Sequence, residues 1–102
     1  MVPQVTKKAP GDCLSIEDVR NEIDNIDRTI IALIGQRFHY VKEVVKYKEP
    51  TAHAIEASSR RIAMLQQRRE WAAEHNLSPD VIEDMYDRLV HYFINEEKKI
   101  AL

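Results

Sequence analysis

Apolar residues recur every three or four positions along most of this chain, which is the spacing of one face of an α-helix. The first run begins after Ser15, a typical N-cap residue with Asp18 as its capping partner three residues later. The run reaches Tyr47, and Pro50 disfavours helix at the residue before it. The pattern therefore predicts a first helix of about 34 residues, about 50 Å long. Its apolar positions form one coiled-coil-like stripe: Ile16, Val19, Ile23, Ile26, Ile30 and Leu33.

A second helix is predicted over about residues 60–75, after a loop at residues 51–57. Ser58 or Ser59 can cap its first turn. Its apolar face is expected to consist of three residues: Ile62, Leu65 and Trp71.

A third helix is predicted to begin after Ser78, with Pro79 at its first position and Asp80 where the helix dipole favours an anion. It is expected to run to about Lys99, and no segment alternates in the manner of a half-buried strand. The predicted fold is therefore all-α, with three helices of which the first is very long. The apolar stripe of the third helix is Ile82, Met85, Tyr86, Leu89, Val90 and Phe93.

Length and composition narrow the class of protein. The 102 residues indicate a single domain over residues 15–102, after an irregular, mobile arm at residues 1–14. Two glycines and four prolines are few for a sheet fold with many tight turns. Seventeen acidic and fifteen basic side chains give a net charge of −2, which excludes a broad basic surface for nucleic acid or an anionic membrane.

A cytoplasmic location is expected from three features. Cys13 is the single cysteine, so no internal disulfide can form. The first ten residues lack the apolar core of a secretory signal. No apolar run approaches the roughly 20 residues of a membrane span.

The length of the first helix predicts a homodimer. A compact chain of this size has a radius of gyration of roughly 13 Å, so it cannot cover a helix of about 50 Å by itself. The uncovered apolar stripe is most simply buried against a second copy.

Charged residues interrupt the inward-facing stripes. Arg37 continues the first stripe, and Lys48, eleven residues later, lies about 20° from the same face. Glu97 follows Phe93 by four residues on the third helix, and Arg60 opens the second. Buried cations are costly unless an anion meets them, so this set favours an anion-binding pocket.

Each of these residues also has an ordinary interpretation. Arg37 can pair with an acidic residue across a dimer, and Lys48 lies near a helix C-terminus, where cations are favoured anyway. Glu97 belongs to a charged run at residues 96–99 of the kind that usually faces solvent.

Other chemistries find less support. The four histidines do not have zinc-ligand spacing, and Asp87 with His91 is read as a surface pair. No glycine-rich phosphate loop and no activated nucleophile is present.

Taken together, these positions resemble the all-helical chorismate mutase family. The segments that carry the resemblance are residues 18–24, 36–38 and 93–97, with Lys48 and Arg60. Within that family the likeness is greatest to the isochorismate pyruvate lyases of salicylate and siderophore biosynthesis, through residues 12–13, 40–42, 71–72 and 91–94. The resemblance covers about residues 12–100.

The resemblance implies an intertwined homodimer with two equivalent active sites and no metal or cofactor. It implies that one chain supplies Arg37, Lys48 and Arg60 to a site, and that the other chain supplies Arg20. The spacing agrees, because Arg20 lies about 25 Å along the helix from Arg37 and on a different face.

The implied substrate is a dicarboxylate with an enolpyruvyl ether, either isochorismate or chorismate. The lyase reaction is a pericyclic hydrogen transfer that gives salicylate and pyruvate, and the mutase reaction is a Claisen rearrangement. Both need the side chain folded over the ring, a conformer that Arg20, Arg37 and Arg60 are expected to clamp. Lys48 is expected to stabilise the negative charge that grows on the ether oxygen.

Glu97 departs from the family, because many members have glutamine there to donate a hydrogen bond to the ether oxygen. Glu97 can donate only when protonated, so we expect activity to be favoured at mildly acidic pH. Arg61 and Ala57 replace acidic residues of mutases, and Phe93 replaces a small polar residue, which favours the lyase. As an anion, Glu97 could instead pair with the amino group of aminodeoxychorismate in a mutase. A third alternative is a non-catalytic dimeric helical module.

Overall fold

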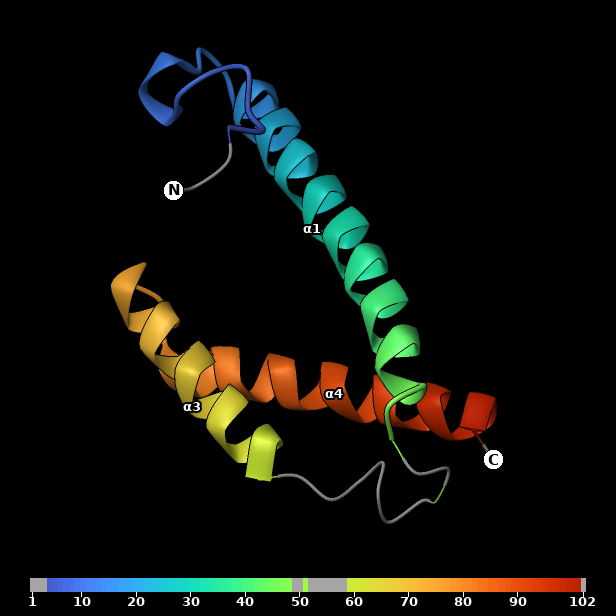
Figure 1. Cartoon of the computed structure of the whole chain (residues 1–102). Helices are drawn as coiled ribbons and strands as arrows, with labels where there is room; N and C mark the ends of the chain where they lie inside the picture. The colour runs from blue at the N-terminus through green and yellow to red at the C-terminus, as the bar shows by residue number, and fades with distance from the viewer. Residues whose placement is uncertain (1–3, 49–50, 52–58, 102) are drawn as a thin grey trace. The chain divides into compact units, whose positions relative to one another are not determined.

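The computed structural model describes residues 4–48, 51 and 59–101, and it is all-helical over these residues. The helices are α1 at Ile16–Val45, α3 at Ser59–Glu74 and α4 at Pro79–Ala101, preceded by a 3₁₀ turn, Pro10–Asp12 (Figure 1). The three-helix, all-α prediction is therefore confirmed. Most of the predicted loop 51–57, and the cap residue Ser58, lie outside the described residues.

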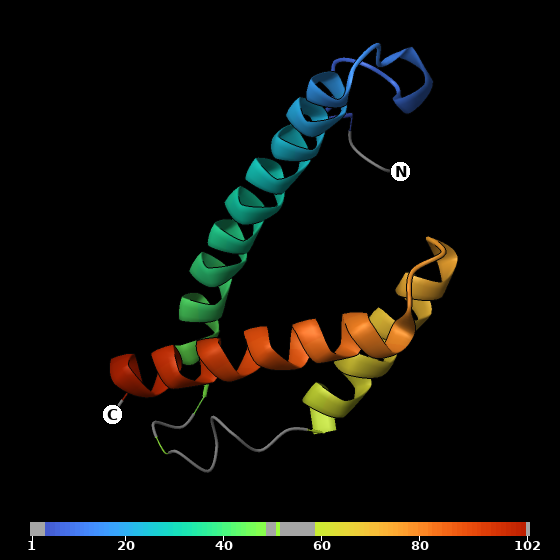
Figure 2. The ribbon, with the colours of Figure 1, turned by 180° about the vertical axis from the view of Figure 1, so that it is seen from behind.

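The chain forms two compact units, Met1–His39 and Tyr40–Leu102. In the first unit α1 begins as predicted, because the backbone N–H of Asp18 donates to Ser15 Oγ over 3.1 Å. The Asp18 carboxylate reaches one residue beyond the cap and accepts the N–H of Leu14 at 2.9 Å. The N-terminal arm folds back beside these first turns, as Figure 2 shows at the blue end of the chain.

The C-terminal end of α1 differs from the prediction. The α-helix ends at Val45 after 30 residues, so it is about 45 Å long, and Tyr47 lies in a turn. The N–H groups of Lys46, Tyr47 and Lys48 each bond the carbonyl three residues back, at 3.1, 2.9 and 3.2 Å. The chain thus tightens into 3₁₀-type turns before Pro50, which was the stop signal that the sequence displayed.

The apolar stripe of α1 is uncovered in this chain. None of the residues Ile16–Val45 is buried, and the six predicted stripe residues are between 39% and 63% exposed. Among the described residues, no helix combines the length and the apolar character needed to cross a membrane. Within the first unit, the stripe is thus an exposed apolar face.

In the second unit α3 packs along α4, and both ribbon views show the two helices side by side (Figures 1 and 2). Met64 and Ala72 of α3 are buried against this partner together with Phe93 of α4. The predicted face of α3 was wrong for Ile62, which is 74% exposed, and for Trp71, which is also exposed, whereas Leu65 is half-buried.

The correct inward face of α3 follows the four-residue row Met64, Arg68 and Ala72. Ala72 is small and lets α4 approach closely. Arg68 takes the middle of the row because its guanidinium lies over the Trp71 ring at 4.5 Å and within 5.8 Å of the Tyr86 ring centre. Because a charged residue stands at the centre of this row, the pattern of apolar residues in the sequence does not identify it as the buried face.

A tight connection joins α3 to α4. Asn76 has φ 60° and closes α3 in a Schellman arrangement, with the N–H of Leu77 bonded to the carbonyl of Ala72 at 2.9 Å. Ser78 then caps α4, accepting the N–H of Val81 at 3.3 Å. The predicted helix end and restart are both confirmed, and the short link holds the two helices as a hairpin.

Candidate active site

Lys48 and Glu97, two predicted site residues far apart in sequence, are in direct contact. Lys48 Nζ lies 3.2 Å from Glu97 Oε2 and 3.5 Å from Oε1. Glu97 is only 5% exposed, and a buried carboxylate is costly unless a cation or hydrogen-bond donors meet it. The Lys48 ammonium meets that need, and the inward register predicted for Glu97 is confirmed, whereas Lys48 reaches Glu97 from a turn after α1 and not from the helical face that was predicted.

Each residue of this pair is positioned by local structure. Lys48 lies on the last 3₁₀-type turn after α1, where its N–H bonds the carbonyl of Val45. Glu97 follows the buried Phe93 by one turn of α4. The solvated interpretation of residues 96–99 is wrong for Glu97, whereas it holds for Lys99, which is exposed and pairs with Glu96 at 3.0 Å.

The Lys48 side chain keeps 31% of its surface exposed, although its partner is buried. Part of the Lys48 side chain is therefore open to solvent, while the buried Glu97 carboxylate holds its ammonium in a fixed direction. This arrangement suits electrostatic stabilisation of a developing negative charge. Within the described residues, no three potential metal-ligating side chains form a group.

The three predicted arginines lie on the surfaces of their helices. Arg20 is exposed and Arg37 is half-buried, both on α1 in the first unit. Arg60 is exposed in the first turn of α3, in the same unit as Lys48 and Glu97. Because seventeen residues of one continuous helix separate Arg20 from Arg37, about 25 Å lies between them.

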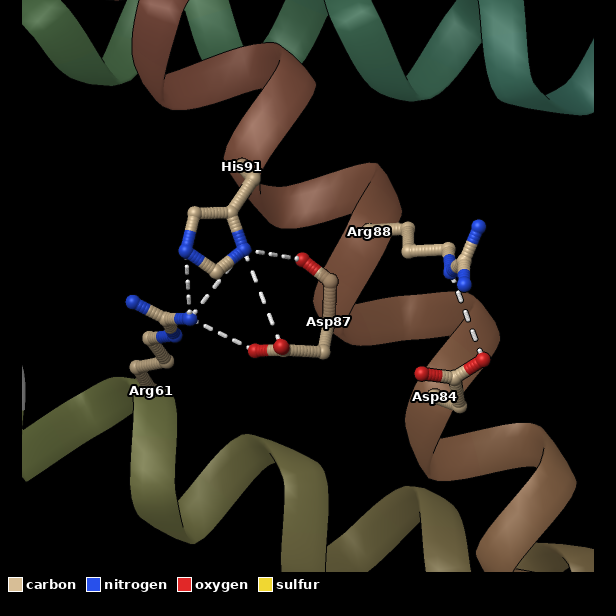
Figure 3. Close-up of polar contacts among 5 residues, drawn as sticks. All are labelled: Arg61, Asp84, Asp87, Arg88 and His91. Carbon is tan, nitrogen blue, oxygen red and sulfur yellow. Dashed lines mark hydrogen bonds and ion pairs between the residues drawn. The ribbon is translucent and has the colours of Figure 1, made fainter.

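A second polar cluster connects α3 to α4 beyond the predicted site residues (Figure 3). Arg61 of α3 lies 2.6 Å from Asp87 Oδ1 and 3.1 Å from His91 Nε2. His91 Nδ1 is 2.8 Å from the carbonyl oxygen of Asp87, which can only accept, so Nδ1 carries the hydrogen. The predicted Asp87–His91 surface pair is confirmed, at 3.7 Å, and Arg61 joins it from the other helix.

Arg61 also sets the charge state of this cluster. The hydrogen bond from its guanidinium, helped by its positive charge, holds the pKa of Asp87 below its ordinary value. Sequence reasoning missed this contact, since the spacing of Asp87 and His91 along one helix carries no information about the facing helix.

Two further residues that depart from the mutase pattern, Arg61 and Phe93, make contacts between α3 and α4. Arg61 is bound to α4, and Phe93 fills the core between the two helices at 3% exposure. Ala57 lies outside the described residues.

Comparison with known proteins places these features in a family. A family model described as chorismate mutase type II matches residues 19–98. The isochorismate pyruvate lyase of Pseudomonas aeruginosa is 38% identical over 92 residues, which are 90% of this chain and 90% of that protein. The T-proteins of Haemophilus influenzae and Enterobacter agglomerans are 41% and 32% identical, over 74% and 71% of this chain but only 20% and 19% of their own lengths. Since the model spans most of the chain, including Lys48 and Glu97, the chain belongs to the chorismate mutase type II family.

Proposed function

We propose that this protein is an isochorismate pyruvate lyase, with weak chorismate mutase activity as a side reaction. The observation that carries the proposal is the partly exposed Lys48 side chain, whose ammonium is held against the buried Glu97 carboxylate. The likeness to the lyase of Pseudomonas aeruginosa, which extends over nine-tenths of both proteins, supports this reaction. The substrate is a small dicarboxylate, and the product is salicylate.

The proposed reaction needs positioning and electrostatics rather than a nucleophile. A ring hydrogen of isochorismate moves to the methylene carbon of the enolpyruvyl group while the bond between the ring and the ether oxygen breaks. Pyruvate leaves, and the ring becomes aromatic as salicylate. Lys48 faces the ether oxygen, where negative charge grows, and thereby stabilises the transition state more than the ground state.

The arginines in this proposal bind the two carboxylates of the substrate. Arg37 and Arg60 act from the same chain as Lys48, and Arg20 comes from a second copy. Guanidinium groups suit this task because they bind carboxylates through two parallel hydrogen bonds, which fixes the folded conformer.

A homodimer is part of the proposal. It is supported by the uncovered stripe of α1, since six apolar side chains between 39% and 63% exposed form one continuous face. A second copy that covers this face with its own α1 buries both stripes at once. The position of Arg20, about 25 Å from Arg37 along one helix, suits delivery to the site of that second copy.

A mutase is the second candidate, favoured by two observations. The first is the likeness to the T-proteins, which align with most of this chain, together with the match to the chorismate mutase type II model. The second is Glu97, a buried carboxylate that is able to pair with a cationic group of a substrate. Such a mutase would act on chorismate or on 4-amino-4-deoxychorismate, whose amino group offers that partner.

The reaction is tested by incubating the purified protein separately with isochorismate, chorismate and aminodeoxychorismate, following salicylate fluorescence and loss of substrate. Rapid salicylate formation from isochorismate supports the lyase. Faster turnover of either other substrate would assign the mutase, and turnover of none would leave a non-catalytic helical module.

Lys48→Ala tests the residue that carries the proposal. We expect the rate constant kcat to fall about 10²–10³-fold, as when one donor to a developing oxyanion is removed. Lys46→Ala is the matched control, because Lys46 is exposed and pairs with Glu43 on the surface at 3.0 Å. Equal rates for Lys48→Ala and the wild type would contradict the assignment.

Glu97→Gln tests the role of the carboxylate. The ion pair with Lys48 uses the ionised carboxylate, whereas donation to the ether oxygen needs the protonated form. In the second role the wild type is fastest at mildly acidic pH, and glutamine extends that rate to neutral pH. The rate is measured from pH 5 to pH 8 for both proteins. Identical pH profiles would exclude Glu97 from this role.

A further inference from the structure

The N-terminal arm is bound to two carboxylates on the first turns of α1. The Lys8 ammonium lies 3.0 Å from Asp18 Oδ2, and the backbone N–H of Lys8 donates to Glu22 Oε2. The backbone N–H of Leu14, at the other end of the same segment, donates to Asp18 Oδ2 at 2.9 Å. Asp18 therefore ties the arm to the helix at two points.

The contacts between the arm and α1 favour the charged forms of Lys8, Asp18 and Glu22. The N–H of Leu14 and the Lys8 ammonium hold the pKa of Asp18 below its ordinary value, and the N–H of Lys8 does the same for Glu22. The hydrogen bond to Asp18 raises the pKa of Lys8. Asn25 orients the second carboxylate by donating to Glu22 Oε1 at 2.8 Å. The contact is thus fully charged at neutral pH.

Arg20 lies on the same two turns but projects from the opposite side. It is two residues after Asp18 and two before Glu22, and at 100° per residue each lies about 160° away around the helix axis. The arm therefore holds one side of the helix and leaves Arg20 exposed on the other.

Apart from the Ser15 cap, these first turns are not held by any buried side chain of α1. The opening N–H groups of a helix have no partners within it, and α1 buries no residue within this chain. Fraying of even one turn would move the Arg20 guanidinium by several ångströms, because the turn has a pitch of about 5.4 Å.

We infer that the arm is a positioning device for substrate binding, in which Asp18, Glu22 and Lys8 fix the first turns of α1 so that Arg20 is held in place for a substrate carboxylate. This inference rests on the proposed role of Arg20. Asp18, Glu22 and Lys8 are positioning residues, since they act through the helix and not on the substrate.

The first test is the kinetics of Asp18→Ala. Without the Asp18 contacts, the Arg20 guanidinium is no longer held in place to bind a substrate carboxylate. Because this binding is the same before and during the reaction, we expect KM to rise about 5- to 10-fold and kcat to change by no more than about twofold. A merely structural role would reduce the amount of active enzyme and leave KM unchanged. Glu17→Ala is the matched control, because Glu17 is an exposed carboxylate on the same turn.

The second test repeats Asp18→Ala in an Arg20→Ala background, where no further rise in KM is expected. Lys8→Ala, which leaves the helix cap intact, is expected to raise KM about two- to threefold, again only while Arg20 is present. An unchanged KM in Asp18→Ala, or the same rise in both backgrounds, would overturn the inference. If Arg20→Ala itself leaves KM unchanged, the proposed role of Arg20 fails instead, and the two failures are thereby distinguished.

Discussion

The helix α1 and the α3–α4 hairpin carry the same kind of apolar pattern, yet they use it differently. The hairpin buries Met64, Ala72 and Phe93 between its own two helices. Helix α1 buries none of its 30 residues within the chain. An apolar stripe in the sequence thus predicts which side chains of a helix are to be buried, but it does not predict whether they are buried within the same chain.

This difference suggests that the hairpin and α1 contribute to the proposed site in different ways. The hairpin is able to hold the buried Glu97 carboxylate because it has a core of its own, and Lys48 reaches that carboxylate from the turn after α1. In the proposed dimer, the stripe of α1 pairs with another copy and carries Arg20 with it.

The largest effect is expected from a charge on the α1 stripe. Ile26→Asp places a carboxylate in the proposed dimer contact, at a cost of about 3 kcal/mol or more in each copy. We expect the dimer to weaken at least about 100-fold and activity to fall with it, measured by sedimentation and by turnover over a range of protein concentrations.

Ile62→Asp is the control for that substitution. Ile62 is 74% exposed on α3, so a carboxylate there is expected to leave assembly and activity close to those of the wild type. If both variants behave alike, the contrast between the two regions is wrong.

A large but different effect is expected from Phe93→Ala, which opens a cavity inside the hairpin. The free energy of unfolding should fall by about 3–5 kcal/mol, measured by urea denaturation. Because Phe93 belongs to the core of the hairpin and is not part of the α1 stripe, the variant should still assemble under conditions where it is folded. Dissociation of a folded variant would contradict this difference between the hairpin and α1.

A smaller effect is expected at the polar side of the hairpin. Asp87→Asn removes the carboxylate that Arg61 contacts at 2.6 Å, and since both side chains are partly exposed the loss should be below about 1 kcal/mol. Asp84→Asn should have no measurable effect, because Asp84 and Arg88, which pair at 3.3 Å, are both well exposed. Figure 3 draws this pair.

The pH dependence of that effect has a defined sign. The folded-state pKa of Asp87 lies below its ordinary value near 3.8, so its contribution is complete above that pH and is lost as the pH falls through the lowered value. Wild type and Asp87→Asn should therefore differ in free energy of unfolding at pH 7, and the difference should shrink as the pH falls below 3.8. A difference that grows in acid would contradict the contact.

Local chemistry made much of the fold predictable. The caps Ser15 and Ser78, the end of α3 near Asn76 and the inward register of Glu97 are all found as predicted. These features depend on nearest neighbours or on helical period, which a single sequence displays.

What failed depended on contacts between distant segments. The face of α3 was misjudged because Arg68 packs inward by stacking on aromatic rings, and the contact of Arg61 with Asp87 needs the facing helix. The bonds of Lys8 were missed as well, although Asp18 and Glu22, four residues apart beside a basic arm, were a signal that could have suggested them.

The central claim, that one site is assembled from two copies, is tested most directly by mixing two impaired variants. Arg20→Ala and Lys48→Ala are each expected to be slow alone. After subunit exchange, half of the dimers are mixed, and each mixed dimer contains one intact site and one site with both changes. The account predicts recovery to about one quarter of the wild-type rate. A mixture no faster than the two variants measured separately would show that Arg20 and Lys48 act within one chain.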